Sequence, residues 1–339
     1  MLLNFSHDVG SPETLKLLLV LTAADVSAVG PTVWTSWKVD LLLNLYRRTM
    51  MLLSGQTDLL EETARLNSIR AEVVALLSAD EPAAETERRL SQFPAHYLLS
   101  TPADRVAEDL RIIARRSPDD IHVEGRYEPE TDTVAYRVIT HERMVGGCFY
   151  KLTGVLTSQR MEILSAEICT SQDGAIVDSY RVLDHDHAGE VPVFRIEAVA
   201  EVMRRVLTGE ADVQTLLNPR RRFGPSRVQG PVSNLPMRIV IDNDWSDRYT
   251  AVEVFAHDRP GLLYQISRTI YELGLSVARA KISTHFDQVV DAFYVTDAAG
   301  SKIHDAQQLQ MIHDRLAEEI NRFESTAASE IADSAPARS

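Results

Sequence analysis

The feature that most constrains the fold of this 339-residue chain is an internal repeat within residues 131–324. Identical or similar residues recur at an offset of 116 residues at the start of the repeat, of 114 over its middle, and of 113 after a predicted hairpin. The matched pairs are Tyr150/Tyr264, Ala166/Ala280, Ile168/Ile282, Thr170/Thr284, Asp178/Asp291, Tyr180/Phe293, Val182/Val295, Asp184/Asp297, His141/His257 and Arg143/Arg259. Because the matches follow one order of strands and helices, we interpret them as two copies of a single module.

The repeated pattern predicts an α+β fold. Each copy alternates apolar strands and amphipathic helices in the order βαββα, and the alternating segment Met237 to Asp242 is assigned to the first copy as its closing strand. This order is typical of a ferredoxin-like sandwich, in which helices cover one face of an antiparallel sheet. Since such sheets have open edges, we expect the two modules to pair side by side.

Breaks in the pattern divide the chain into five parts. Ser11-Pro12-Glu13 resembles a capped helix start and opens a segment predicted to be helical. The small, polar C-terminal tail is expected to be disordered. The parts are the helical segment 1–80, a linker with one helix at 81–130, module one at 131–242 (with its own linker at 209–236), module two at 247–324, and the tail 325–339.

The composition excludes several classes of protein. The net charge of −14 argues against nucleic acid as a partner, and 45% hydrophobic with 25% charged residues is ordinary for a soluble globular chain. Two cysteines, Cys148 and Cys169, are too few for a disulfide framework, and their apolar surroundings predict buried, reduced thiols. Without an apolar run long enough for a membrane span or a signal sequence, we expect a cytoplasmic protein with no membrane partner.

The most specific motif is the phrase His257-Asp258-Arg259-Pro260-Gly261-Leu262-Leu263. It connects a predicted strand, Thr250 to Ala256, with a predicted amphipathic helix, Leu262 to Leu273. Proline favours the backbone angle of a first helical turn, and glycine lets a ligand approach the backbone closely. The unpaired amides at a helix N-terminus then favour an anion such as a carboxylate.

The motif predicts a binding site for a small carboxylic acid without a catalytic side chain. We expect the amides of Gly261, Leu262 and Leu263 to hold the carboxylate, and Asp258 to accept a hydrogen bond from an α-ammonium group. An ordinary tight turn into a helix is the alternative. Asp291, on the third strand of module two, is a further candidate ligand contact, with a solvated strand residue as the alternative.

Module one departs from this motif. Where module two has Pro260-Gly261-Leu262, module one has Met144-Val145-Gly146-Gly147-Cys148. The glycines keep a flexible connection, whereas the proline is lost. We call the segment between strand and helix the elbow: Asp258 to Leu263 in module two, and Met144 to Cys148 in module one. Only the elbow of module two has a proline that restricts its backbone angle.

These residues resemble a known family. Module two looks like an ACT domain, a regulatory module that often binds amino acids. The whole chain resembles the C-terminal part of the bifunctional PII uridylyltransferase/uridylyl-removing enzyme family. The segments that carry this resemblance are Leu21 to Asp25, Gly30-Pro31, Trp34 to Lys38, Phe93 to Leu99, Ile241 to Asn243, His257 to Leu263 and Val290 to Asp297.

The resemblance implies a role in nitrogen-status signalling. In that family a nucleotidyltransferase domain adds UMP to PII, a metal-dependent HD domain removes it, and two ACT domains sense glutamine. Glutamine or a similar amino acid is thus the implied ligand. PII or a separate catalytic chain is an implied partner, and a homodimer through the ACT modules is a further expectation. The Mg or other divalent metal of the family is expected in the domains missing here, and this chain is expected to hold no cofactor.

The chain lacks the catalytic patterns of that family. No Gly-Ser turn followed by paired aspartates is present, and His7-Asp8 lies in the wrong place for the HD doublet. Asp25 falls where the late metal-binding Asp would lie, which leaves an incomplete metal site. We therefore expect a C-terminal fragment, a truncated gene product or half of a split enzyme. The alternatives are a residual uridylyl-removing phosphodiesterase that uses Asp25, and a purely structural ACT interaction module.

Overall fold

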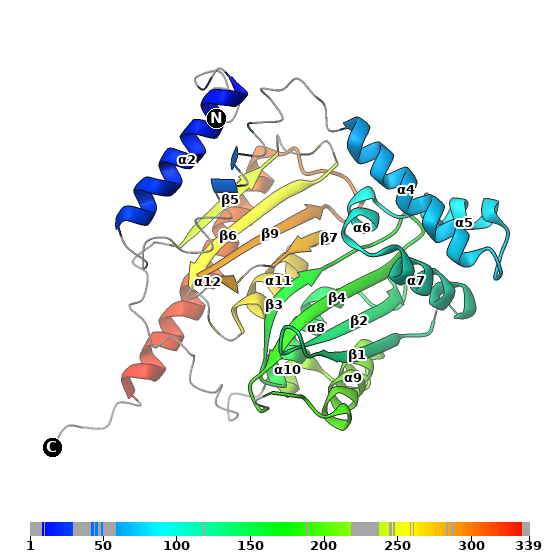
Figure 1. The fold of residues 1–339 in the computed structure, drawn as a ribbon. Helices are drawn as coiled ribbons and strands as arrows, with labels where there is room; N and C mark the ends of the chain where they lie inside the picture. The colour runs from blue at the N-terminus through cyan, green and yellow to red at the C-terminus, as the bar shows by residue number, and fades with distance from the viewer. Residues whose placement is uncertain are drawn as a thin grey trace. The chain divides into compact units, whose positions relative to one another are not determined.

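The computed structural model of the chain forms two compact units, residues 1–75 and 76–339 (Figure 1). Each unit is considered by itself. The structure describes residues 9, 11–29, 42–43, 45–46, 49, 59–117, 119–187, 189–217, 237–243, 246, 248–257, 259, 261–282, 284–285 and 288–333.

The first unit is helical where the structure describes it. Helix α2 (Pro12–Val29) begins at the predicted cap, where Ser11 Oγ accepts a hydrogen bond of 3.1 Å from the amide of Thr14. Helix α4 (Leu59–Leu77) follows and continues into the second unit. The helical expectation for residues 1–80 therefore holds over both described helices.

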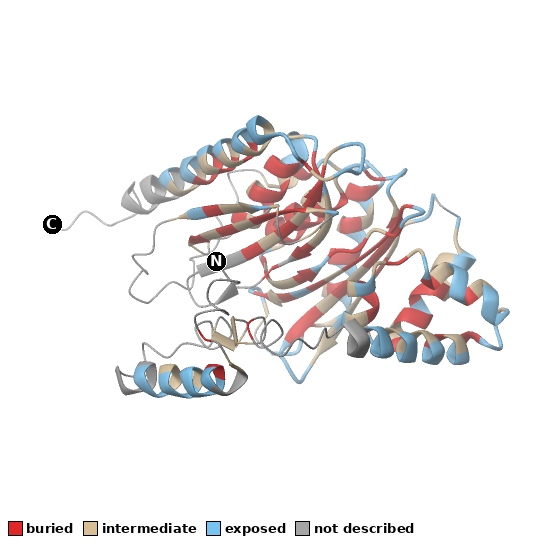
Figure 2. Cartoon of the chain, turned by 90° about the horizontal axis from the view of Figure 1, so that it is seen from above, coloured by how far each residue is buried: buried red, intermediate tan, exposed pale blue. Residues whose placement is uncertain are grey.

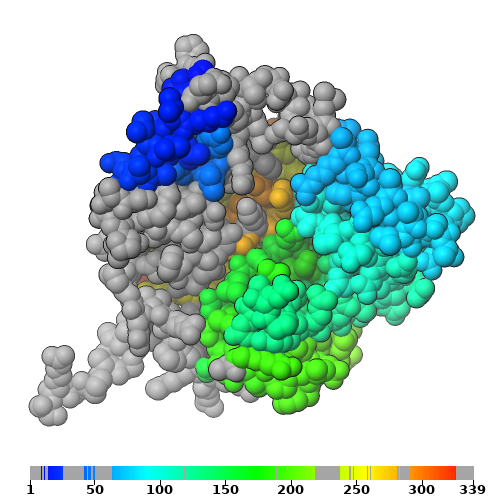
Figure 3. Space-filling view, in the orientation of Figure 1, coloured from blue at the N-terminus to red at the C-terminus, as the bar shows by residue number. Residues whose placement is uncertain are grey.

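Three short helices precede the first sheet strand. They are α5 (Ala83–Leu90), α6 (Ala95–Ser100) and α7 (Ala103–Arg115). Helix α7 docks on module one through a buried ion pair, in which Arg137 donates to Asp109 at 2.5 Å through Nε and again through a terminal nitrogen. Tyr97 of α6 also donates to Asp109. In Figure 3, α5–α7 (cyan) and module one (green) adjoin on this surface.

Both modules follow the order ββαββα, and module two has one additional two-residue strand, β8. In module one the elements are β1 (His122–Glu128), β2 (Thr133–His141), α8 (Cys148–Ser158), β3 (Met161–Glu167), β4 (Ala175–Asp184) and α9 (Val193–Leu207), followed by α10 (Val213–Leu216). In module two they are β5 (Arg238–Asp242), β6 (Thr250–His257), α11 (Leu262–Glu272), β7 (Ser276–Lys281), β8 (Thr284–His285), β9 (Gln288–Thr296) and α12 (Ala306–Asp333).

The strands form one continuous antiparallel sheet across both modules. Its order in the described residues is β1-β2-β4-β3-β7-β9-β6-β5, with β8 paired to β9. Helices α8, α9, α11 and α12 cover one face, whereas α6 and α7 lie on the other face of module one (Figures 1 and 2). The expected α+β fold with an antiparallel sheet is confirmed.

Two strand assignments from the sequence need correction. The segment 238–242, expected to close module one, pairs with β6 and belongs to module two. The edge of module one beside β2 is already occupied by β1, which lies inside the predicted linker 81–130. Strand β1 carries little alternation of apolar residues, and its Gly125 is needed because a Cβ there would lie 2.4 Å from Ile196.

The last helix also differs from expectation. Helix α12 (Ala306–Asp333) continues past residue 324, the predicted end of module two, through part of the segment 325–339 that was expected to be disordered. Residues 334–339 lie outside the described residues.

The modules meet as the repeat predicts, with equivalent elements facing each other. Strand β3 pairs with β7 at Glu167 and Lys281, and α8 packs against α11. Thr153 Oγ1 and Ser267 Oγ, which are 114 residues apart as the repeat offset requires, lie 2.9 Å from each other. The ring of Phe149 contacts that of Phe293 at 6.2 Å, so both modules share one hydrophobic core.

Candidate functional site

The elbow of module two has the predicted local geometry. Strand β6 ends at His257 and helix α11 begins at Leu262, with Gly261 as its N-cap in the left-handed region at φ +92°. Only glycine adopts this conformation without strain. From the sequence, close approach of a ligand was the expected reason for a glycine at this position. The positive φ is a second reason, and it does not depend on a ligand.

The backbone donors at this elbow are not all available. The amide of Leu262 already donates to the carbonyl of Arg259 at 3.0 Å, and the Leu262 side chain is buried in the core. The expectation that Leu262 offers its amide to a ligand is therefore wrong, because the turn uses that donor itself. The amides of Gly261 and Leu263 have no acceptor among the described residues.

The side chains of the motif are partly described. Arg259 is half-buried and has no ion-pair partner within the described part of the chain. Asp258 and Pro260 lie outside the described residues, so their predicted contributions stay predictions. Backbone amides at a helix N-terminus, in a motif that also contains an arginine, are groups suited to binding a carboxylate.

Asp291 lies in the core, with 1% of its surface exposed. The solvated-strand alternative for this residue is therefore excluded. Its partner in the repeat, Asp178, is fully buried and accepts a hydrogen bond of 3.4 Å from Tyr180, while its Oδ1 has no hydrogen-bond partner among the described residues.

Burial determines the protonation of Asp178. Burial raises the pKa of this carboxyl to about 7, although the Cys169 amide, the Tyr180 hydroxyl and the Cys148 thiol favour its charged form. Cys148 is the first residue of α8, so this carboxyl lies beneath the elbow of module one. Both cysteines are free and buried, as predicted.

The space in front of the two elbows differs. Gly147 is the N-cap of α8 at φ +71°, and a Cβ on it would lie 2.2 Å from Tyr150 and 2.9 Å from Tyr271. These two rings contact each other, with centroids 4.7 Å apart. Two aromatic side chains therefore fill the space at the elbow of module one.

The elbow of module two is less crowded by the same measure. Among the described residues, the nearest atoms to a Cβ on Gly261 belong to Thr157, at 3.6 Å, and Phe323, at 3.7 Å. Thr157 is the repeat equivalent of Tyr271. Because the residue at the end of α8 is small, a Cβ on Gly261 would make only ordinary van der Waals contact with it, and module one supplies part of the surroundings of this elbow.

Thr157 and Phe323 are not among the site residues predicted from the sequence. Thr157 lies near the end of α8 and Phe323 lies on α12, and neither is close in sequence to the motif. The repeat alignment could have paired Thr157 with Tyr271 as a difference between the copies. It could not show that each residue lies against the elbow of the opposite module.

Asp25 occupies an exposed position on α2. No group of three or more His, Cys, Asp or Glu side chains in the described ranges is arranged to hold a metal ion. His7 and Asp8 lie outside those ranges. Metal analysis of the purified chain is the test of the phosphodiesterase alternative.

No helix in the described part of the chain is both long and apolar enough to span a bilayer.

Comparisons with known proteins place this geometry in context. Residues 238–324 match a family described as an ACR9-like, ACT-like domain, which spans β5 to α12. The bifunctional uridylyltransferase/uridylyl-removing enzyme of Azospirillum brasilense is 32% identical over 92% of this chain and 33% of its own length. The enzyme of the same name from Rhodospirillum rubrum is 32% identical over 93% of the chain and 33% of its length.

This chain is a relative of these bifunctional enzymes. The same enzyme of Ruegeria pomeroyi is 30% identical over 96% of the chain and 36% of its own length. The resemblance predicted from the sequence is therefore confirmed, and the match fits the C-terminal region of the uridylyltransferase/uridylyl-removing enzymes. The chain spans about a third of the length of these relatives.

Proposed function

We propose that this chain is a glutamine-sensing regulatory region in nitrogen-status signalling, with its ligand site at the elbow of module two. The observation that carries the proposal is that Gly261 is less crowded than Gly147, since a Cβ on it would meet Thr157 of module one and Phe323 only at ordinary van der Waals distance. The ACT-like match over module two and the similarity to uridylyltransferase/uridylyl-removing enzymes support a regulatory role.

The ligand carboxylate is held by the amides of Gly261 and Leu263, with Arg259 as counter-charge. Thr157 closes the site from module one. A ligand that contacts both modules favours one arrangement of the pair, so its binding energy shifts the population of two states. The output passes to PII or to a catalytic partner.

Calorimetric titration of the purified chain with glutamine, with glutamate and serine as controls, tests this proposal. We expect saturable heat with glutamine alone. Absence of binding for all three amino acids would overturn the sensor proposal and leave the structural interaction module.

A variant shows where the ligand binds. Gly261→Val is expected to abolish binding, but it also strains a backbone at φ +92°. Thr157→Tyr fills the same space without that strain, because the equivalent position of module two, Tyr271, already carries tyrosine. Thr208→Tyr, at an exposed position after α9, is the matched control that leaves binding unchanged.

A further inference from the structure

The C-terminal part of α12 lies against the elbow of module two. At the elbow itself, a Cβ on Gly261 would lie 3.7 Å from the ring of Phe323. Just before the elbow, Nδ1 of His257 lies 3.4 Å from Oε1 of Glu324. We call residues 319–324 of α12 the clasp, because they contact the chain on both sides of the elbow.

The clasp is anchored after the elbow. The side-chain amide of Gln265, on α11, donates a hydrogen bond of 3.0 Å to Oε2 of Glu319. Glu319 is buried and also pairs with Arg315 at 2.8 Å. A buried carboxylate with two partners is costly to separate from them, so this end of the clasp is fixed.

The other end of the clasp is held more weakly. The side chains of His257 and Glu324 are 23% and 22% exposed, and their 3.4 Å contact is longer than a typical hydrogen bond. The ring of Phe323 is only half-buried. Partly exposed ion pairs contribute little to stability, so the end of the clasp separates from the elbow more easily than Glu319 separates from α11.

Module one has no counterpart of the clasp among its described residues. Helix α9 ends at Leu207, the repeat equivalent of Ile320, whereas α12 continues through the clasp. His141, the equivalent of His257, instead lies 2.8 Å from the carbonyl oxygen of Asp173. The shared fold therefore does not require the clasp, which indicates a role specific to module two.

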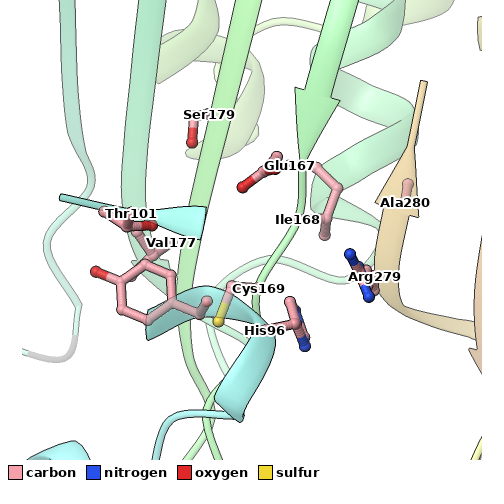
Figure 4. Close-up of a pocket in the computed structure, with 10 residues that line it drawn as sticks. His96, Thr101, Glu167, Ile168, Cys169, Val177, Ser179, Arg279 and Ala280 are labelled. Carbon is pink, nitrogen blue, oxygen red and sulfur yellow. The ribbon is translucent and has the colours of Figure 1, made fainter. Parts of the chain in front are cut away.

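The cavity at the junction of β3 and β7 is too small to be an alternative ligand site. It has a volume of about 20 Å³, and His96, Glu167 and Arg279 are among the residues that line it (Figure 4). This volume admits about one water molecule. An amino acid does not fit there, so the elbow remains the proposed ligand site.

We propose that the clasp is an autoinhibitory contact, in which Phe323 covers the elbow until the ligand displaces it. This inference rests on the proposed function and adds how access to that site is regulated. A ligand that reaches the amide of Gly261 competes with the ring for the same space. The apparent affinity is therefore reduced in proportion to the fraction of chains whose clasp is open. Displacement moves the end of α12, and this movement carries the ligand signal toward a partner.

Hydrogen exchange of the full chain tests the displacement directly. The amides of residues 319–324 are expected to exchange faster with saturating glutamine than without it, because helical turns that lose their tertiary support fray. The amides of α8 are the internal reference and should not exchange faster. Slower exchange of the clasp with glutamine would show that it closes over the ligand, and unchanged exchange would show that it does not move. Either result overturns the proposal.

Variants of the clasp test its effect on affinity. Phe323→Ala is expected to bind glutamine ~5-fold more tightly in calorimetry, since the open fraction rises. Glu324→Gln, which keeps the volume of the side chain, is expected to act in the same direction. Met311→Ala is the matched control that leaves binding unchanged, because Met311 is an exposed apolar side chain on the same helix and lies outside the clasp.

The outcomes separate this inference from the proposed function. Glutamine binding that is weaker or unchanged in both Phe323→Ala and Glu324→Gln would show that these side chains do not compete with the ligand, and it overturns the clasp alone. Absence of glutamine binding in the native chain and in all three variants overturns the proposed function, and the clasp with it.

Discussion

Modules one and two share a fold and differ in what surrounds it. Both place a left-handed glycine before the first helix and a buried aspartate on the central strand. In module one the elbow is filled by Tyr150 and Tyr271, whereas in module two the equivalent space is bordered by Thr157 and Phe323. The two copies thus share a core, while single side chains at the junction decide how crowded each elbow is.

The outer faces of the sheet differ as well. Arg137 of β2 forms a buried ion pair with Asp109, which holds α7 against module one. The equivalent position of β6 is Glu253, which is half-buried and cannot make that pair. Module one therefore binds the preceding helices through the Arg137–Asp109 ion pair, and module two has the less crowded elbow.

The largest expected effect tests this connection. Arg137→Met leaves Asp109 buried without its charged partner, so the free energy of unfolding should fall by about 3–5 kcal/mol. The equivalent change in module two, Glu253→Gln, should alter stability by less than about 0.5 kcal/mol. Urea unfolding of both variants measures this contrast, and equal losses would show that the two faces are equivalent.

The next effect concerns the buried carboxyl of module one. The pKa of Asp178 is raised from 3.8 to about 7, so the unfolded chain releases this proton at lower pH than the folded chain does. The native protein should lose stability from about pH 4 to pH 7, by up to about 1.4 kcal/mol per pH unit. In Asp178→Asn this loss should be absent.

Unfolding in urea at several pH values measures the difference between the native chain and Asp178→Asn. The advantage of the variant should grow as the pH rises and become constant above pH 7. Parallel stability curves would show that the Asp178 carboxyl is already ionised in the folded protein.

A smaller effect is expected at the elbow of module two. Thr157→Tyr should weaken glutamine binding at least ~10-fold, which corresponds to about 1.4 kcal/mol, because the ring occupies the space at Gly261. Calorimetry with the Thr208→Tyr control measures it. Unchanged affinity would place the ligand elsewhere while leaving glutamine binding itself intact.

The reverse change is expected to have the smallest effect on stability. Tyr271→Thr removes the contact with Tyr150 and should cost about 0.5–1.5 kcal/mol, since the ring is 44% exposed. It should also open the elbow of module one, so that the stoichiometry of glutamine binding rises from one to two. A stoichiometry that stays at one would show that the Met144 to Cys148 segment cannot bind without the proline.

Much of the fold could be predicted from the sequence because its signals are local. The alternation of β2, β4, β6 and β9 and the helical spacing of α8 and α11 appear within short windows. Strand β1 was missed because it lies at an edge with one buried residue, Val123. Strand β5 was given to the wrong module because an alternating segment does not identify its hydrogen-bonding partner.

The sequence by itself determined the repeat, the glycine elbow between strand and helix and the family resemblance, since each depends on residue type and spacing. Only the tertiary structure decided that the N-terminus of α8 lies beside the C-terminal end of α11, and that the N-terminus of α11 lies beside the C-terminal end of α8. That contact brings Thr157 to Gly261 and Tyr271 to Gly147 across more than a hundred residues of chain. The same pairing of β3 with β7 places Arg279 beside His96, because neighbours across a sheet edge are set by the packing of whole modules and not by local spacing.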